Sequence, residues 1–190
     1  MIRIKTKDLS VRTQNENILD HIDLQIEDGE TVLVCGKPGS GKTILLKTLK
    51  GLIENKEEFT VEGEKLVRGN IGMVFQHPEK QIVRNIVFQD VVFELENLGL
   101  SRDEIKSRVS KYSDLLNAEY LLDRKVNQLS HGEITKVALL SCLVTEPDII
   151  LLDEPLSTLD SRNQKLLLES IDLLRETDKT IIIAEHDVRH

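Results

Sequence analysis

The segment GKPGSGKT, residues 36–43, constrains the fold of this chain more than any other part of its sequence. It follows an apolar run, TVLVC, and precedes leucines at helical spacing. A loop of the pattern G-x-x-x-x-G-K-[ST] between a strand and a helix lets successive backbone amides face phosphate oxygens. Lys42 is expected to reach the β- and γ-phosphates, and the Thr43 hydroxyl to bind Mg²⁺. The segment therefore predicts a site for a nucleoside triphosphate. The residues expected around the phosphates are Gly36, Lys37, Pro38, Gly39, Ser40, Gly41, Lys42 and Thr43.

Apolar runs and helical patterns alternate along the rest of the chain. Strands are expected at MIRIK, IDLQI, TVLVC, NIGMVF, DIILLD and KTIIIAEH, with TVLVC as a buried central strand. Helices are expected after the glycine-rich loop, between about 86 and 118, from Ser130 and from Asp160. Runs that are apolar on both faces are typical of parallel strands covered by helices. The sequence thus predicts an α/β fold with a largely parallel sheet.

The composition argues against several classes of protein. A formal net charge of -8 over 190 residues, with no Trp, argues against a nucleic-acid-binding surface. Cys35 and Cys142 lie in separate apolar runs and are expected to be buried free thiols. No apolar run approaches membrane-spanning length and no signal-peptide pattern opens the chain, so any membrane role is expected to come through a partner.

Two acidic residues follow the apolar run at 149–152 in the segment IILLDEP. Ligands of open α/β sheets bind at the carboxyl ends of the strands, which is where Asp153 and Glu154 are expected. Asp153 suits the Mg²⁺ shell, and Glu154 suits a group that orients or deprotonates the attacking water. An acidic turn without chemistry is the alternative, and the glycine-rich loop disfavours it.

Two further features allow both a structural and a functional interpretation. His186 follows an apolar strand; a lone histidine is usually structural, yet the parallel strand order brings this one towards the γ-phosphate. Ser130 and Glu133 in LSHGE fit a capping box that starts a helix. The same helix N-terminus is also an anion site, because its free amides and dipole favour phosphate.

Together these motifs resemble those of the ATP-binding-cassette (ABC) family along nearly the whole chain. The matching segments are GKPGSGKT as Walker A, Gln76 in GMVFQHPEKQ as the Q-loop, LSHGE (129–133) as the signature, IILLDEP as Walker B, STLD (157–160) as the D-loop and His186 as the switch histidine. The resemblance implies a head-to-tail dimer, of two identical or two different subunits, closed by ATP. It places Ser130, His131, Gly132 and Asp160 at the nucleotide, and Gln76 at the Mg²⁺ with Thr43 and Asp153.

The resemblance also implies an organisation and a partner. One ABC domain, 1–190, is expected to hold a nucleotide-binding core at about 1–76 and 147–190, with an N-terminal antiparallel β part. A helical subdomain is expected at about 77–146. The segments NIGMVFQHPEKQIV and QDVVFELENLGLSRDEIKSRV are similar to ATPase subunits of energy-coupling-factor and cobalt/nickel-type importers. That similarity implies uptake of a vitamin or metal ion through a membrane subunit docked on the helical subdomain, at the cytoplasmic face of the membrane.

The sequence departs from the family pattern at several positions. Thr13 stands where an aromatic usually stacks on adenine, and Ile44 stands where a second hydroxyl is common. In the signature, His131 replaces a glycine and Glu133 a glutamine. Family members also continue with more sheet and helix beyond the position of His186. The altered Thr13, Ile44 and His131 keep open a weakly active, largely structural half of a heterodimer. A separate alternative is a soluble ABC ATPase, in which the helical segment after Gln76 serves a soluble partner.

Overall fold

The computed structural model describes residues 1–157 and 159–186, which group into two compact units. The first unit is built from Met1–Met73, Asp148–Glu154 and the residues from Asp178 onward, and the second from Val74–Pro147 and Pro155–Thr177. Within the described residues no helix is both long and apolar enough to cross a membrane.

An antiparallel sheet of three strands opens the first unit. Its strands are β1 (Ile2–Arg12), β2 (Asn17–Glu27) and β4 (Thr60–Val67), in the order β2-β1-β4. Ile4, Leu9 and Val11 of β1 are almost fully buried, because alternate side chains of a strand point to one face. The structure thus confirms the N-terminal antiparallel part that the family resemblance implied.

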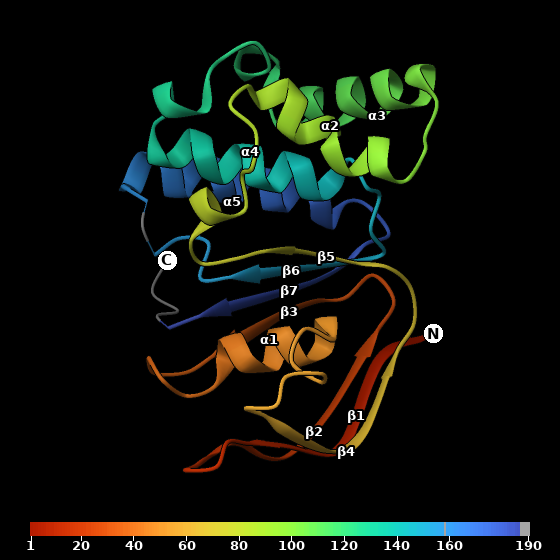
Figure 1. Cartoon of the computed structure of the whole chain (residues 1–190), viewed down its shortest axis with the longest axis vertical. Coiled ribbons are helices and arrows are strands. Elements are labelled where there is room, and N and C mark those ends of the chain that lie inside the picture. The colour runs from red at the N-terminus through yellow and green to blue at the C-terminus, as the bar shows by residue number, and fades with distance from the viewer. Residues whose placement is uncertain (158, 187–190) are drawn as a thin grey trace. The chain divides into compact units, whose positions relative to one another are not determined.

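The second sheet of this unit carries the predicted phosphate-binding loop. Its strands are β3 (Thr31–Cys35), β5 (Ile71–Val74), β6 (Ile149–Asp153) and β7 (Thr180–Glu185), in the order β3-β7-β6-β5. β7 pairs in parallel with both β3 and β6, so the carboxyl ends of these three strands share one edge. The helix α1 (Lys42–Lys50) contacts β2, β6 and β7 and lies between the two sheets of the unit (Figure 1). The predicted α/β fold is confirmed.

The burial of β3 differs from the sequence-based expectation. All five residues of β6 are buried, but Leu33 of β3 is 47% exposed and Cys35 is also exposed. The prediction of TVLVC as a buried central strand was therefore wrong, as was the prediction of a buried thiol at Cys35. The reason is position: among the described strands, β3 pairs only with β7 and lies at the edge of its sheet. Cys142 is buried, as predicted.

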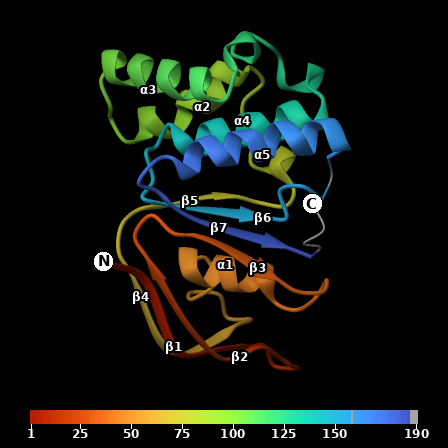
Figure 2. The same ribbon diagram turned by 180° about the vertical axis from the view of Figure 1, so that it is seen from behind.

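The second unit is helical. Its helices are α2 (Val87–Asn97), α3 (Arg102–Leu115), α4 (His131–Leu143) and α5 (Ser161–Arg175), with short 3-10 turns η1 (Pro78–Lys80), η2 (Glu119–Leu121) and η3 (Val126–Gln128). The helix α4 contacts α2, α3 and α5, and Figure 2 shows α4 and α5 side by side. Leu139, Leu140 and Leu143 of α4 are almost fully buried, so α4 forms the centre of this unit.

Side chains cap the helices α3 and α5, and α5 starts after Asp160 as the sequence predicted. The Ser101 hydroxyl accepts a hydrogen bond from the Glu104 amide at 3.3 Å, and Asp160 accepts one from the Asn163 amide at 2.9 Å. These bonds satisfy amides that the first turn leaves without partners. Because α5 packs on α4, residues 155–177 group with the second unit. The helical subdomain at about 77–146 stays a proposal drawn from the resemblance.

Candidate nucleotide-binding site

The loop between β3 and α1 adopts, at two positions, a backbone conformation that favours glycine. Gly39 and Gly41 have φ angles of 80° and 89°, in the left-handed region. A β-carbon on Gly41 would lie 2.9 Å from the carbonyl oxygen of Ile18, so a side chain there would also clash with backbone. The Gly36 amide donates to the Glu185 carbonyl at 3.3 Å, which ties the start of the loop to the end of β7.

Lys42 lies inside this loop. Its Nζ donates to the carbonyl oxygens of Gly36 at 2.8 Å and Lys37 at 3.2 Å, and lies 3.3 Å from Oε1 of Glu154. The side chain is only 5% exposed. Burying an ammonium group costs free energy unless the group is paired. The carbonyl oxygens of the loop and the Glu154 carboxylate provide this pairing, so the positive charge is held between them.

Thr43 and Asp153 meet beside this lysine. The Thr43 hydroxyl donates to Oδ1 of Asp153 at 3.0 Å, and Asp153 is 1% exposed. Burial raises the pKa of the Asp153 carboxyl, and the hydrogen bond from Thr43 opposes that rise. A hydroxyl oxygen next to a carboxylate oxygen is a donor set that Mg²⁺ prefers. The residues present therefore fit the magnesium site expected from the sequence.

Glu154 follows Asp153 in an unusual backbone conformation. Its φ is 46°, which residues other than glycine seldom adopt, and its amide donates to the Ala184 carbonyl at 2.9 Å. Strain of this kind costs about 1–3 kcal/mol and is concentrated at functional sites. The conformation holds the Glu154 side chain, 13% exposed, beside the Lys42 ammonium.

His186 completes the group of residues at this edge. It directly follows β7, whose last residues pair with Cys35 on one side and Asp153 on the other. Its side chain is 43% exposed, and its Nδ1 lies 3.7 Å from a carboxylate oxygen of Glu185. The first unit thus brings the glycine-rich loop, Asp153, Glu154 and His186 to one edge of the parallel sheet.

The remaining predicted residues belong to the second unit. Ser130 accepts from the Glu133 amide at 3.3 Å, and the Glu133 carboxylate accepts from the Ser130 amide at 2.8 Å. The predicted capping box is therefore present. Ser130 and His131 are exposed at the start of α4. Glu133 also pairs with Arg124 at 3.2 Å, a contact that sequence reasoning missed because no spacing pattern signals it.

Gln76 lies between β5 and η1, and Asp160 caps α5. Hydrogen bonds from Asn163, the amide first, hold the pKa of the Asp160 carboxyl below its usual value. Thr158 of the STLD segment lies outside the described residues. The roles of Gln76, Ser130, His131, Gly132 and Asp160 towards a nucleotide stay predictions.

A buried lysine inside a glycine-rich loop, with a hydroxyl and a buried carboxylate at the next strand end, defines a P-loop nucleotide-binding protein. Residues 19–157 match the family model described as ABC transporter. The chain is 34% identical over 193 residues to the energy-coupling factor transporter ATP-binding protein EcfA1 of Thermotoga maritima, covering 100% of this chain and 74% of that protein. The chain belongs to the ABC transporter family of ATP-binding domains, and as a member it is an ATPase domain.

Other similar proteins agree with this assignment. The chain is 36% identical over 201 residues to an ABC transporter ATP-binding protein of Treponema denticola, covering 99% of this chain but only 41% of that protein. Among solved structures, cbiO1 of Clostridium perfringens, part of the ABC transporter complex cbiONQ, superposes with a TM-score of 0.86 at 30% identity. That match covers 98% of this chain and 79% of the cbiO1 chain.

The burial of Asp153 generates a prediction about stability. Because its pKa is raised in the folded state, the stability linked to this group is fully present below its unfolded pKa and is lost as the pH rises through the folded pKa. Asp153→Asn should therefore raise the Tm of the protein without nucleotide or Mg²⁺ by about 2–4 °C at neutral pH. The gain should shrink as the pH falls to about 4, near the ordinary pKa of Asp. Thermal melting across this range measures it, and an equal gain at every pH would contradict the argument.

Proposed function

We propose that this chain is the ATP-binding and ATP-hydrolysing subunit of an importer of the energy-coupling-factor type. It drives uptake of a small nutrient, a vitamin or a metal ion, through membrane partners. The observation that carries the proposal is the cluster of Lys42, Thr43, Asp153 and Glu154 at one edge of the parallel sheet. The importer class is supported by the similarity to EcfA1 and to cbiO1.

Different side chains of the first unit have different roles in phosphoryl transfer to water. The loop amides and Lys42 bind the phosphates and stabilise the charge that develops on them. Thr43 and Asp153 would hold Mg²⁺, which supplies further neutralisation of the phosphate oxygens when bound, and the family resemblance adds Gln76 of the second unit to these ligands. Glu154 orients the attacking water and accepts its proton. His186 donates a hydrogen bond to the γ-phosphate.

The second unit supplies the contacts to another subunit. In a head-to-tail dimer, Ser130, His131 and Gly132 at the start of α4 face the ATP of the partner, together with Asp160. The exposed start of α4 supports this assignment, because first-turn amides and the helix dipole favour an anion. His131 also supports a second candidate function, a weakly active half of a heterodimer, since an imidazole adds bulk and a titratable donor beside the phosphate.

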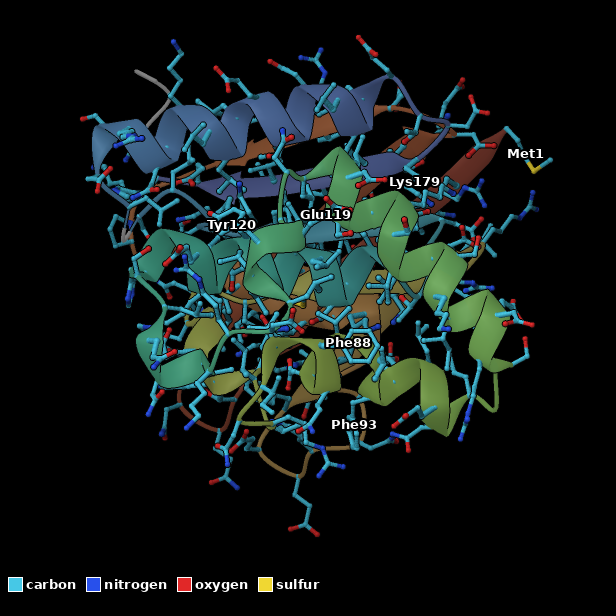
Figure 3. All side chains as sticks on the ribbon, turned by 90° about the horizontal axis from the view of Figure 1, so that it is seen from above. Met1, Phe88, Phe93, Glu119, Tyr120 and Lys179 are labelled. Atoms are coloured by element: carbon cyan, nitrogen blue, oxygen red, sulfur yellow. The ribbon has the colours of Figure 1, made fainter. Side chains whose placement is uncertain are left out.

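The segment after Gln76 presents an apolar surface for a membrane partner. Val83 is 65% exposed, and Phe88, at the start of α2, is 38% exposed (Figure 3). The carboxylate of Asp90, itself buried, accepts hydrogen bonds from the amides of Val83 and Arg84, at 2.8 and 3.0 Å. This surface is therefore held in one shape before a partner arrives. The docking places the chain at the cytoplasmic face of the membrane.

The first prediction from the proposed function concerns Glu154 as the general base. Glu154→Gln should keep ATP binding but slow turnover by about 10²–10⁴, because an amide cannot accept the proton of the attacking water. Phosphate release measures turnover, and a fluorescent ATP analogue measures binding. Glu169→Gln, exposed on α5, is the control and should behave as the wild type. Wild-type turnover in Glu154→Gln would remove Glu154 from this role.

The second prediction concerns the membrane partner. The tagged full chain should co-purify with integral membrane proteins from detergent-solubilised membranes. Val83→Asp should lose them, because a charge on this apolar surface must be desolvated on docking. Leu98→Asp, at the other end of α2 and 60% exposed, should retain them. A partner found only in the cytosolic fraction would favour the soluble, non-transport alternative.

The third prediction concerns the signature histidine. His131→Gly should raise turnover at the site that this signature completes and leave the affinity of the chain's own loop for ATP unchanged. His131→Ala is the matched control, because it removes the imidazole without adding glycine to the helix, and it should act in the same direction. Steady-state turnover and nucleotide titration measure the two effects. A fall in turnover in both variants would make His131 a phosphate ligand instead.

A further inference from the structure

Gly132 lies in close contact with the side chain of Asn163. A β-carbon placed on Gly132 would lie 2.5 Å from Cγ, 2.6 Å from Oδ1 and 3.0 Å from Cβ of Asn163. Gly132 is not among the glycines with positive φ, and it lies within α4, so its backbone conformation suits any residue. Packing against Asn163, rather than backbone conformation, is therefore what requires glycine at this position.

Asn163 cannot easily move away from this contact, because Asp160 holds it at two points. One carboxylate oxygen of Asp160 accepts the Asn163 backbone amide at 2.9 Å, and the other accepts its side-chain Nδ2 at 3.0 Å. The first bond caps α5, and the second fixes the rotamer of the asparagine. The clash at position 132 would therefore involve both the Cβ and the amide group of a side chain that the hydrogen bonds to Asp160 hold in place.

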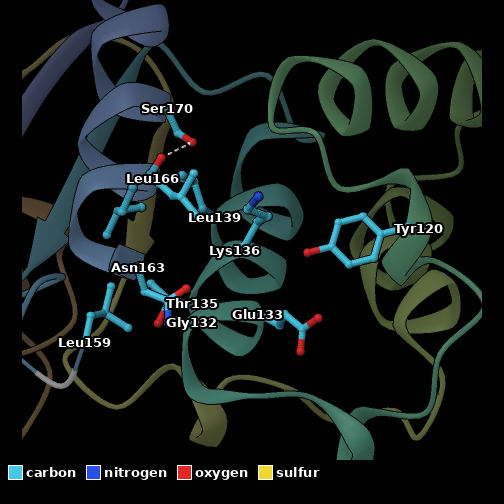
Figure 4. Close-up of a pocket in the computed structure, with 11 residues that line it drawn as sticks. Tyr120, Gly132, Glu133, Thr135, Lys136, Leu139, Leu159, Asn163, Leu166 and Ser170 are labelled. Carbon is cyan, nitrogen blue, oxygen red and sulfur yellow. Dashed lines mark hydrogen bonds between the residues drawn. The ribbon is translucent and has the colours of Figure 1, made fainter. Parts of the chain in front are cut away.

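Beside this contact a cavity lies between parts of α4 and α5, which otherwise pack on one another. Thr135, Leu139 and Leu166 are among the residues that line it (Figure 4). Side chains across an open cavity constrain one another little, because they lack the dense contacts of a packed interior. The close approach of Asn163 to Gly132 is therefore one point at which α5 limits the position of the first turn of α4.

We propose that Asn163 is a positioning residue for the signature segment 130–132. Its side chain, held by Asp160, fixes the first turn of α4 against the first turn of α5, and Gly132 is required to make room for it. This inference rests on the proposed function, in which segment 130–132 and Asp160 face the nucleotide. The signature segment 130–132 and Asp160, both assigned to the same nucleotide, are then held together within one chain and move together.

A double-mutant cycle on the full chain tests this inference. The variants are Gly132→Ala, Asn163→Ala and the combination of both, with Lys165→Ala, exposed on α5, as control. Gly132→Ala alone should lower kcat by about 10-fold. In the Asn163→Ala background, the same substitution should lower kcat by less than about 3-fold. Coupling of this size is usual for residues in contact. Asn163→Ala alone should lower kcat and leave the KM for ATP unchanged, because the chain's own loop is intact.

A further variant tests the hydrogen bond between the Asn163 side chain and Asp160. Asn163→Asp keeps the shape of the side chain but replaces its donor by a carboxylate that Asp160 repels. It should lower kcat as Asn163→Ala does. Wild-type kcat in this variant would show that the bond to Asp160 does not position Asn163.

The result that would overturn the proposal is additivity. If Gly132→Ala costs the same with and without Asn163, glycine is required there for another reason, such as close approach of a phosphate to the backbone. The same cycle read by Tm separates this failure from a failure of the proposed function. Absence of turnover in the wild type, both alone and with a cognate second ATPase subunit, refutes the function. Coupling or additivity of the Tm changes still decides whether the Asn163 side chain is what requires glycine at position 132.

Discussion

The burial of two opposite charges at one sheet edge is the constraint on which the rest of this structure depends. The Lys42 side chain is 5% exposed and Asp153 is 1% exposed. Burying such groups costs several kcal/mol each unless partners compensate, on the order of the whole stability of a domain. The loop carbonyls, Glu154 and Thr43 are those partners, and only the parallel register of β3, β6 and β7 brings them together.

Two features at this edge of the parallel sheet lower the stability of the fold. Glu154 stays at a positive φ, and the burial of Asp153 raises its pKa although its role needs the ionised form. Neither feature helps the chain to fold. The first places the Glu154 carboxylate next to the Lys42 ammonium, and the second follows from a buried carboxyl group beside the Thr43 hydroxyl. Strain and unfavourable ionisation in one place are typical of a site retained for its chemistry.

In the second unit, groups that start the helices are also the groups assigned to the nucleotide. Ser130 caps α4 with its hydroxyl while its exposed position leaves the first turn accessible, so capping and phosphate recognition are compatible. Glu133 adds a negative charge at this helix start, and Arg124 neutralises it while stacking on the ring of Tyr120. The departure from glutamine at this position therefore has a compensating cation in the same unit.

The sequence by itself determined the local features: the glycine-rich loop, the strands around it, the helix caps at Ser130 and Asp160, and the positions of Asp153 and Glu154. Each depends on residues a few positions apart, whose spacing sets hydrogen bonds and conformation directly. Only the tertiary structure decided that β3 is an edge strand among the described residues, that Arg124 pairs with Glu133, and that Asn163 fills the space beside Gly132. Those facts depend on which segments pack together, because burial and contact are properties of neighbours in space that spacing along the chain does not encode.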